Sequence, residues 1–533
     1  MNFNKKTIVL AVLSITIGLR IDAIPVIDNP MTRAVIQVYD ESLRENPTDY
    51  DTYFRRGNEF YRQSEYMRAL DDVNNALKYM PSTELDLRIQ ALLLRASIYN
   101  VTDRPEQALT DLTQATSLSP DTYAIVYQKA NTELELGDYT EAKADYIRLQ
   151  RLNSRSTEAL IGLARIAVKE NNLGLANDYI NQAVAIDPSN SEIYVRQASV
   201  HRLMGDDNAA VQDLLLALST DSRNTHAVQD LIEMGSENYP AVMTGLSDAI
   251  RQAPSVGMFY YIRAMIAQAH FKYGAAITDF NKIIDEKLYN YHGLYASLAE
   301  CHYALGDYIR AMQNIDQAMS MVKDYAPYYT LRSKIQLAQG EFESALNSAS
   351  QAVFLMPTSI PAIVQKGLAL VGIKDYSEAS SQFGEAALSG DTDPIYLMMR
   401  AWVCEGFLHQ PIAARGFYRQ VDEMEIPEDN IKSFKGFALL YLGQTELADE
   451  WMQNILTNVP DYDGMIHYYA TCFYAQAGNS DRALDYMKKA LELGYANYYD
   501  WTTNNEARIN VAPLRKDERF RQLLHQYSHI FNS

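Results

Sequence analysis

The sequence predicts an all-α chain built from a repeated pair of helices, and three observations support this prediction. Short phrases recur: Leu136-Gly137-Asp138-Tyr139 and Leu305-Gly306-Asp307-Tyr308 are each followed by an alanine three residues after the tyrosine. Glycine (24) and proline (17) are scarce in 533 residues, as expected for a helical protein rather than a turn-rich β protein. Aligned on that alanine, the chain contains twelve segments, mostly 34 residues apart, which start at residues 50, 89, 123, 157, 191, 257, 292, 326, 360, 394, 429 and 464.

Position 8 of each segment gives independent evidence for this register, because only small residues occur there. It is occupied by Gly57, Ala96, Ala130, Ala164, Ala198, Ala264, Ala299, Ser333, Gly367, Ala401, Gly436 and Thr471. Each segment is predicted to form two helices of about three turns, whose backbones approach closely at the small residues of positions 8 and 20. We therefore expect Ala142, Ala311 and Ala379, all at position 20, to be almost fully buried. Proline at position 32, where present, ends the second helix.

This pattern resembles the tetratricopeptide repeat family, because several positions agree across twelve copies over residues 50–497. Other helical-pair repeats have different lengths or lack the small residue at position 8 together with alanine at position 20. The resemblance implies a right-handed α-solenoid (superhelix) of about 12–13 helix-turn-helix repeats with terminal caps. In that family the first helices line a concave groove.

The repeats have two ends and one irregular segment. Residues 24–49 are predicted to form an N-terminal capping helix, and residues 498–533 a C-terminal cap. Repeats 1–5 occupy residues 50–224, and repeats 7–13 occupy residues 257–497. Residues 225–256 are a degenerate repeat, in which the sequence from Met234 to Pro240 is expected to shorten the first helix. Either a bend or an ordinary divergent repeat would explain this segment.

Residues 1–23 have the layout of a secretory signal peptide. Lys5 and Lys6 precede an apolar stretch from Thr7 to Leu19, and Ala23 is a small residue at the end of the segment. A retained N-terminal anchor and an ordinary buried helix are the alternatives. No later segment is apolar enough to span a membrane, so we expect an exported bacterial protein, periplasmic or associated with the cell envelope, or else secreted.

The composition gives no sign of an enzyme or of a nucleic-acid-binding protein. A formal net charge of −20 does not suit binding to phosphate backbones. No Gly-rich phosphate loop, nucleophile elbow or metal-ligand motif occurs, so no catalytic residue, cofactor or metal site is predicted. Cys301, Cys404 and Cys472 lie in separate repeats, and no disulfide is expected between them. For the adjacent Glu300, Cys301 and His302, a structural role is favoured over a catalytic one.

The resemblance places positions 2, 5, 9 and 12 of each first helix in the groove. Chaperone adaptors of the family clamp a carboxylate with lysine at position 5 and asparagine at position 9. Asn58 and Asn131 are present here, but Phe54 and Tyr127 replace the lysine, which argues against a carboxylate clamp. An aromatic, moderately apolar groove suits an extended peptide or a helix. The candidate partner-binding residues are Trp402, Phe437, Tyr468, Tyr261, Met265, Tyr303, Phe54, Tyr61 and Tyr127.

Among these candidates, Trp402, Phe437 and Tyr468 are expected to contribute most of the binding energy. The N-terminal aromatic residues Phe54, Tyr61 and Tyr127 form the alternative site. The favoured function is a non-catalytic protein–protein interaction scaffold that holds a protein or peptide partner in the groove. A module binding glycans or small ligands is the first alternative, and an enzyme subunit is the second. The sequence does not identify the partner.

Overall fold

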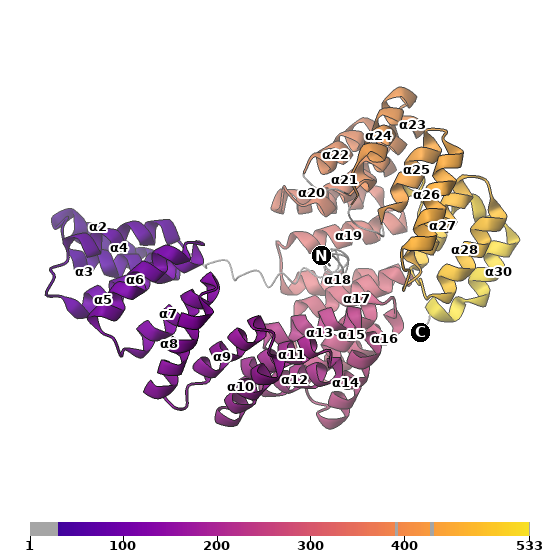
Figure 1. Ribbon diagram of the computed structural model, residues 1–533. Coiled ribbons are helices and arrows are strands. Elements are labelled where there is room, and N and C mark those ends of the chain that lie inside the picture. The colour runs from indigo at the N-terminus through magenta and orange to yellow at the C-terminus, as the bar shows by residue number, and fades with distance from the viewer. Residues whose placement is uncertain (1–29, 390–392, 427–430, 532–533) are drawn as a thin grey trace. The chain divides into compact units, whose positions relative to one another are not determined.

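The computed structural model describes residues 30–389, 393–426 and 431–531 of the chain (Figure 1). These residues form helices joined by short turns, and no strand occurs among them. The prediction of an all-α repeat fold is therefore confirmed. The predicted signal peptide lies outside the described residues.

The chain forms two compact units, and the boundary between them, after Leu231, falls within helix α13. The N-terminal unit begins with α2 (Pro30–Glu45), which packs on the first helix of the first pair. The unit contains five helix pairs: α3 (Tyr50–Arg62) with α4 (Tyr66–Tyr79), α5 (Leu85–Val101) with α6 (Pro105–Leu118), α7 (Tyr123–Leu136) with α8 (Tyr139–Leu152), α9 (Thr157–Lys169) with α10 (Leu173–Ile186), and α11 (Ser191–Met204) with α12 (Asp207–Thr220).

The pair α13 (Thr225–Glu237) and α14 (Tyr239–Gln252) comes next, and seven further pairs complete the repeats of the C-terminal unit. They are α15 (Gly257–Ala269) with α16 (Tyr273–Asp285), α17 (His292–Ala304) with α18 (Tyr308–Met321), α19 (Ala326–Gln339) with α20 (Phe342–Leu355), α21 (Ile360–Gly372) with α22 (Tyr376–Leu388), α23 (Ile395–Gly406) with α24 (Pro411–Glu423), α25 (Ser433–Tyr441) with α26 (Thr445–Asn458), and α27 (Met465–Gln476) with α28 (Ser480–Glu492).

Most first helices pack most extensively on the second helix of their own pair. First helices also contact the first helices of neighbouring repeats, as α5 contacts α7 and α7 contacts α9. In the described part of the chain, second helices make no comparably extensive contacts with one another. Because the first helices touch one another and the second helices make no comparable contacts among the described residues, the row of first helices is the shorter of the two. The first helices therefore line the inner side of each unit. We call this surface the first-helix face.

The small residues of the repeat lie where the two backbones of a pair meet. Ala142, Ala311 and Ala379 have no exposed surface, which confirms the prediction for position 20, and all twelve residues of position 8 are buried. The repeat that starts at residue 394 is an exception at position 20, because Ala414 rather than Ala413 is the buried alanine of its second helix.

Replacing Ala311 with leucine is expected to destabilise the C-terminal unit by about 1–3 kcal/mol. Ala311 is completely buried on α18 and packs in one cluster with Ala299 and Tyr303 of α17, so a larger side chain must displace them. Urea denaturation followed by circular dichroism measures the change. The matched control is Ile309→Leu on the exposed side of the same helix, which should leave stability unchanged. Equal effects of the two substitutions would contradict this packing.

The recurring phrase Leu305-Gly306-Asp307-Tyr308 has a direct structural reason. Gly306 has a φ of 79°, a left-handed conformation that ends α17 and that side chains disfavour. The side chain of Asp307 then accepts a hydrogen bond from the backbone N–H of Arg310 at 3.1 Å and caps α18. Tyr308 is the first residue of that helix. The phrase therefore encodes the turn between the two helices of a pair.

The degenerate repeat differs from its prediction in one respect. Pro240 lies in the first turn of α14, where proline is tolerated. The prediction that the preceding sequence shortens the first helix is wrong, because α13 runs from Thr225 to Glu237 and is as long as α3 or α9. Asn238 takes the place that Asp307 has in the turn before α18, and its side chain caps α14. Gly235 lets α13 approach Ile266 of α15, since a Cβ there would lie only 2.7 Å from that side chain.

Ion pairs join the two helices of several repeats at one recurring spacing. An arginine or lysine at position 7 of the first helix binds an aspartate at position 23, sixteen residues later. The described residues include the pairs Arg56–Asp72, Arg95–Asp111, Lys129–Asp145 and Arg263–Asp279. In each pair the nitrogen–oxygen distance is 2.7 Å and the aspartate side chain is at most 15% exposed. These pairs link the two helices of a repeat.

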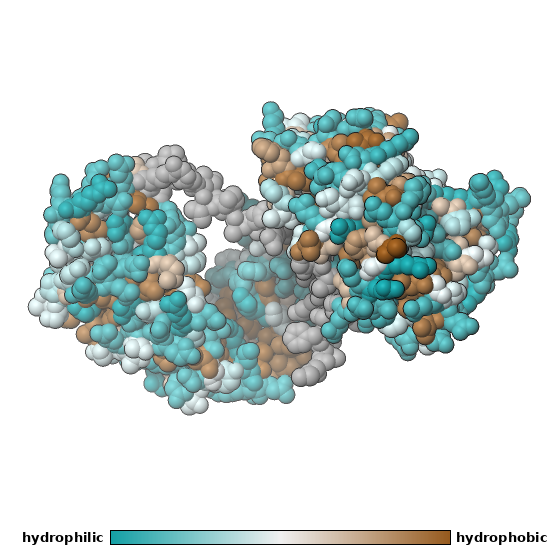
Figure 2. All heavy atoms as spheres, turned by 90° about the horizontal axis from the view of Figure 1, so that it is seen from above, coloured by the Kyte–Doolittle hydropathy of each residue, from teal (hydrophilic) through white to brown (hydrophobic). Residues whose placement is uncertain are grey.

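The surface seen in Figure 2 is mostly hydrophilic, and its apolar residues form small separate groups. Among the described residues, none of the helices combines the length and the apolar character needed to cross a bilayer.

Candidate functional site

Five of the nine predicted partner-binding residues are buried in the C-terminal unit. Phe437, Met265 and Tyr468 are at most 2% exposed, and Tyr261 and Tyr303 are 5% exposed. A side chain with so little surface cannot anchor a partner in this conformation. The prediction that Phe437, Tyr468, Tyr261, Met265 and Tyr303 contact a partner is therefore wrong for the chain in this state.

The segment that follows the last repeat packs on two of these five residues, Tyr468 and Tyr303. It contains α29 (Tyr498–Thr502), η2 (Glu506–Arg508), η3 (Ala512–Leu514) and α30 (Glu518–Gln526), followed by η4 (Ser528–Phe531). A simple end cap would pack on α28, and α30 does so. By contrast, α29, η2 and η3 pack on α17, α23 and α27, which are all first helices. Residues 498–514 thus cover part of the first-helix face of the C-terminal unit.

Aromatic residues of this segment and of the turn just before it pack directly on Tyr468 and Tyr303. The Tyr468 ring lies edge to face with Trp501 at 5.0 Å and stacks on Tyr495 at 4.7 Å, while the Tyr303 ring lies 5.5 Å from Tyr499. Polar contacts extend the interface: Tyr441 donates a hydrogen bond to the carbonyl of Arg508 at 2.8 Å. At Tyr468 and Tyr303, the chain itself therefore covers side chains that were predicted to face a partner.

Trp402 is half-buried, neither inaccessible nor fully exposed. Its ring lies edge to face with Phe407 at 5.4 Å, and Phe407 stacks on Tyr376 of the preceding repeat at 4.5 Å. Trp402 therefore takes part in packing between neighbouring repeats. Its contribution to partner binding stays a prediction.

Glu300, Cys301 and His302 do not have the properties of a catalytic group. Burial raises the pKa of the Cys301 thiol well above its ordinary value, which keeps the thiol protonated and poorly nucleophilic. Burial also lowers the pKa of His302. The Glu300 carboxylate accepts a hydrogen bond from Gln268 at 2.8 Å, and its pKa rises to about 8, chiefly because of burial, although Lys334 opposes the rise. Among the described residues, no group of three or more potential metal ligands comes together.

Glu300 is expected to make the stability of the C-terminal unit depend on pH. Its pKa is about 8 in the folded chain against an ordinary value of 4.5, so the folded state binds the extra proton between these values. Stability should therefore fall as pH rises from about 4.5 to about 8, by at most about 1.4 kcal/mol per pH unit. Glu300→Gln removes this titration, and urea denaturation at several pH values should give a flatter profile. Parallel profiles of the two proteins would contradict the assignment.

The N-terminal unit retains an accessible first-helix face. Position 5 carries an apolar residue in four successive repeats. Each of these side chains is half-buried, so part of it packs against the repeat and part is accessible on the first-helix face. These residues are Phe54, Leu93, Tyr127 and Ile161. The series ends at Val195, which is buried. Tyr61, at position 12 of the first repeat, is also half-buried and its ring lies 5.9 Å from the Tyr66 ring. The three predicted N-terminal residues thus remain partly accessible.

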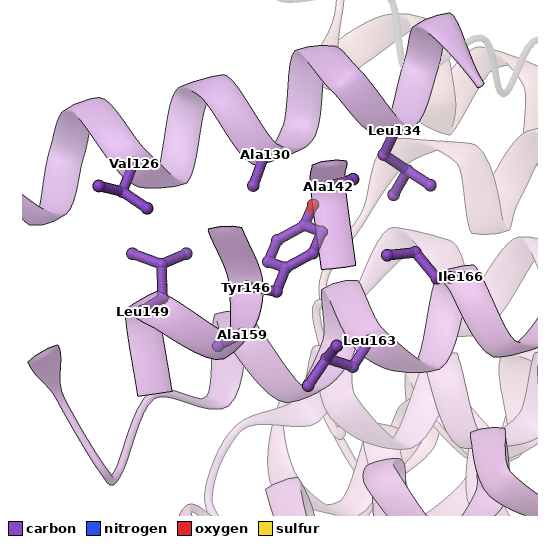
Figure 3. Packing of buried hydrophobic residues seen from close by; sticks show 9 residues of the cluster. All are labelled: Val126, Ala130, Leu134, Ala142, Tyr146, Leu149, Ala159, Leu163 and Ile166. Carbon is purple, nitrogen blue, oxygen red and sulfur yellow. The ribbon is translucent and has the colours of Figure 1, made fainter. Parts of the chain in front are cut away.

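One polar side chain of this face is held in a fixed orientation. Tyr146 of α8 is fully buried, and its ring lies between α7 and α9 (Figure 3). Its hydroxyl donates a hydrogen bond to the Oδ1 atom of Asn131 on α7 at 2.7 Å. Gly162 of α9 makes room for the ring, because a Cβ at that residue would lie 2.3 Å from it. Asn131 is half-buried, and no described residue accepts a hydrogen bond from its Nδ2.

The charges beside Asn131 are already paired. Arg165 of α9 binds Glu135 of α7, so neither presents an isolated charge to a partner.

Sequence reasoning did not identify Tyr146 or Gly162, since both belong to core positions. The glycine within α9 was a detectable signal of close packing, because almost any other residue is more favourable inside a helix.

The structure also has a shallow, open depression of about 480 Å³ in the N-terminal unit. It lies over the second helix α6 and the turn between α7 and α8, and none of the predicted residues lines it. Its lining residues are Glu106, Leu109, Thr110, Thr113, Leu136 and Asp138.

A family model described as tetratricopeptide repeat matches residues 127–191, which include most of α7 and the whole of α8, α9 and α10. The match assigns tetratricopeptide repeats to this part of the chain. The match covers the Asn131 and Tyr146 contact, and the remaining repeats follow from their spacing and buried small residues.

Two curated proteins are similar to this chain. It is 20% identical over 489 residues to mitochondrial import receptor subunit TOM70 of Homo sapiens, a match that covers 86% of this chain and 79% of that one. It is 28% identical over 116 residues to outer dynein arm-docking complex subunit 4 of Xenopus laevis, covering 22% of this chain and 21% of that one.

Among solved structures, yeast Tom70 matches 76% of this chain and 99% of its own, with a TM-score of 0.36 and 14% identity. YrrB, described as a TPR protein with an unusual peptide-binding site, matches 37% of this chain and 98% of its own, with a TM-score of 0.29 and 18% identity.

Proposed function

We propose that this protein is a non-catalytic scaffold that binds a protein or peptide partner on the first-helix face of its N-terminal unit. The observation that carries the proposal is the series Phe54, Leu93, Tyr127 and Ile161, which shows one apolar side chain per repeat. Partly exposed apolar side chains in register suit a partner that lies along the helices. The corresponding face of the C-terminal unit is partly covered by residues 498–514.

Two further lines support the proposal. Of the two curated relatives, the one matched over the larger part of its length is named an import receptor subunit. That name describes a binding role. The buried Cys301 thiol and the neighbouring His302 offer no reactive group, which favours a scaffold over an enzyme. The apolar stretch from Thr7 to Leu19 favours export, so the partner is sought in the cell envelope or the secreted fraction.

Affinity capture from a native envelope extract tests the proposal with a matched pair of variants. Tyr127→Ala together with Leu93→Ala removes two central side chains of the series, and should weaken capture of the partner by about 2 kcal/mol or more. The control is Ile147→Ala on the second helix α8, which is 38% exposed and should leave capture unchanged. Circular dichroism confirms that each variant is folded. Unchanged capture by the double variant would move the partner site elsewhere.

A further inference from the structure

One arginine of the terminal segment is held on the C-terminal unit by three side chains of the repeats. Arg508 of η2 donates a hydrogen bond from Nη1 to the Oε2 atom of Glu405 on α23 at 2.7 Å. Its guanidinium also lies over the ring of Tyr441 on α25, 5.6 Å from the centroid. Tyr418 of α24 donates to the same Oε2 atom at 3.2 Å and so orients the carboxylate. A fixed carboxylate beside an aromatic face is well suited to a guanidinium. We call Glu405, Tyr418 and Tyr441 the Arg508 site.

The backbone that carries this arginine is strained. Ala507 and Arg508 have φ of 48° and 58°, a left-handed conformation that residues with a side chain disfavour. Elsewhere in the described part of the chain, residues with a side chain and a positive φ occur singly. Tyr441 donates a hydrogen bond to the Arg508 carbonyl at 2.8 Å, so the Arg508 site also holds the strained backbone. Strain of this kind clusters at ligand clamps and switch regions, and it lowers the free energy needed to release η2.

Fixed points of the terminal segment lie on both sides of η2. On one side, Arg515 donates from Nη1 to the Oδ1 atom of Asn505 at 2.8 Å. On the other side, Gln476 of α27 donates to the carbonyl of Asn510 at 3.0 Å. A movement of η2 away from α23 therefore needs to involve only the few residues between these two points.

Burial differs in the same way along the segment. Trp501 and Val511, which lie outside the two fixed points, have no exposed surface. Within η2 only the small Ala507 is buried. The side chains of Arg508 and Glu405 are 39% and 33% exposed, so water and dissolved ions reach the pair between them. The contact of η2 with α23 is thus the weakly held part of a segment whose two ends are firmly packed.

We propose that the Arg508 site is filled by Arg508 in the closed chain and by an arginine of a protein partner when η2 moves away. The partner's arginine makes the same contacts without the strained backbone, which favours the exchange. The net charge of −20 also favours a partner with basic side chains. In the closed chain, η2 is therefore an autoinhibitory contact on the C-terminal unit.

N-acetyl-arginine amide added to the full chain tests whether the site exchanges its occupant. The readout is hydrogen exchange followed by mass spectrometry. Residues 506–510 should exchange about threefold faster with the probe, because it takes the place of Arg508 and releases η2. A compound that bound only to the closed chain would slow exchange instead. N-acetyl-lysine amide at the same concentration carries the same charge without the planar guanidinium, and should have little effect.

Two variants test the site with its own arginine removed. Arg508→Gly empties the site and should remain folded, because glycine adopts a φ of 58° without strain. Ligand-observed NMR should show that it binds N-acetyl-arginine amide about ten times more tightly than the unchanged chain, since no internal arginine competes. Adding Glu405→Gln should abolish this binding. Arg508→Ala keeps the strain, so its residues 506–510 should exchange faster than those of Arg508→Gly.

Arg482 of α28 provides a matched control within the same unit. It binds Asp449 at 2.9 Å and lies 4.1 Å from the centroid of the Tyr474 ring, so it has a similar pair of partners. However, it lies inside a regular helix, which stores no comparable strain. N-acetyl-arginine amide should therefore leave exchange around Arg482 unchanged.

The outcomes decide between an exchangeable site and an ordinary structural ion pair. Unchanged or slower exchange of residues 506–510 with the arginine probe would overturn the proposal, even if Arg508→Gly bound the probe. An equal effect of the lysine probe would overturn the preference for a guanidinium. Leu93 and Tyr127 lie in the other unit, so their alanine variants should leave these results intact. This proposal can therefore fail while the proposed function stands, and the reverse.

Discussion

Trp501→Ala is expected to lower the free energy of unfolding of the C-terminal unit by about 3–5 kcal/mol. Trp501 is the largest side chain without exposed surface among the described residues. Its ring lies edge to face with Tyr468 at 5.0 Å and with Tyr495 at 5.9 Å, and its Nε1 donates to the Tyr495 carbonyl at 3.2 Å. Alanine would leave a cavity where the terminal segment meets the repeats.

Urea denaturation followed by circular dichroism measures this loss, and hydrogen exchange locates it. Exchange should accelerate in α27, whose Tyr468 packs on Trp501, and in residues 495–514. The matched control is Trp402→Ala, which removes a half-buried tryptophan and should cost clearly less. Equal losses for the two substitutions would show that the terminal segment contributes little to the C-terminal unit.

The repeats themselves could be predicted from the sequence because their packing is periodic. A small residue at positions 8 and 20 is required wherever two helix backbones approach, so it recurs at a fixed spacing and is visible in one sequence. The turn phrase around Gly306 and Asp307 is visible for the same reason. The phrase therefore predicts the end of one helix and the capped start of the next.

The burial of the expected C-terminal anchors could not be predicted in this way. Tyr441 meets Arg508 across 67 residues, and Arg508 meets Glu405 across 103, so neither contact follows the repeat period. Tyr468 occupies the same repeat position as Tyr127, and what separates them is Trp501, which belongs to a non-repeating segment. A side chain at an inward-facing position of the repeat can therefore still be covered by another segment of the same chain.

The recurring ion pairs were accessible to sequence reasoning and were missed. A basic residue at position 7 and an aspartate at position 23 occur together in four repeats, at a constant separation of sixteen residues. Viewed singly, each charge resembles one on an ordinary solvated helix surface. Their common spacing is the signal that distinguishes a buried pair from surface charges.

Asp111→Ala is expected to destabilise the N-terminal unit by about 3–5 kcal/mol. Arg95 donates two hydrogen bonds to the Asp111 carboxylate, both at 2.7 Å, and a third to Asn74 of the preceding repeat at 2.9 Å. The Asp111 side chain is only 5% exposed and that of Arg95 is 21% exposed. Without the carboxylate, the guanidinium is left partly buried and without its main partner, which raises the energy of the folded state.

The double variant Arg95→Met with Asp111→Leu separates that cost from the strength of the pair itself. Because it removes both charges and fills similar volume with apolar groups, it should recover most of the stability lost in Asp111→Ala. Urea denaturation measures the global change, and hydrogen exchange should show faster opening of α5 and α6 in the single variant. As a control, Asp51→Ala breaks the exposed pair with Arg55 on α3 and should produce no comparable loss. A double variant as unstable as Asp111→Ala would mean that the pair stabilises the repeat beyond what apolar packing can replace.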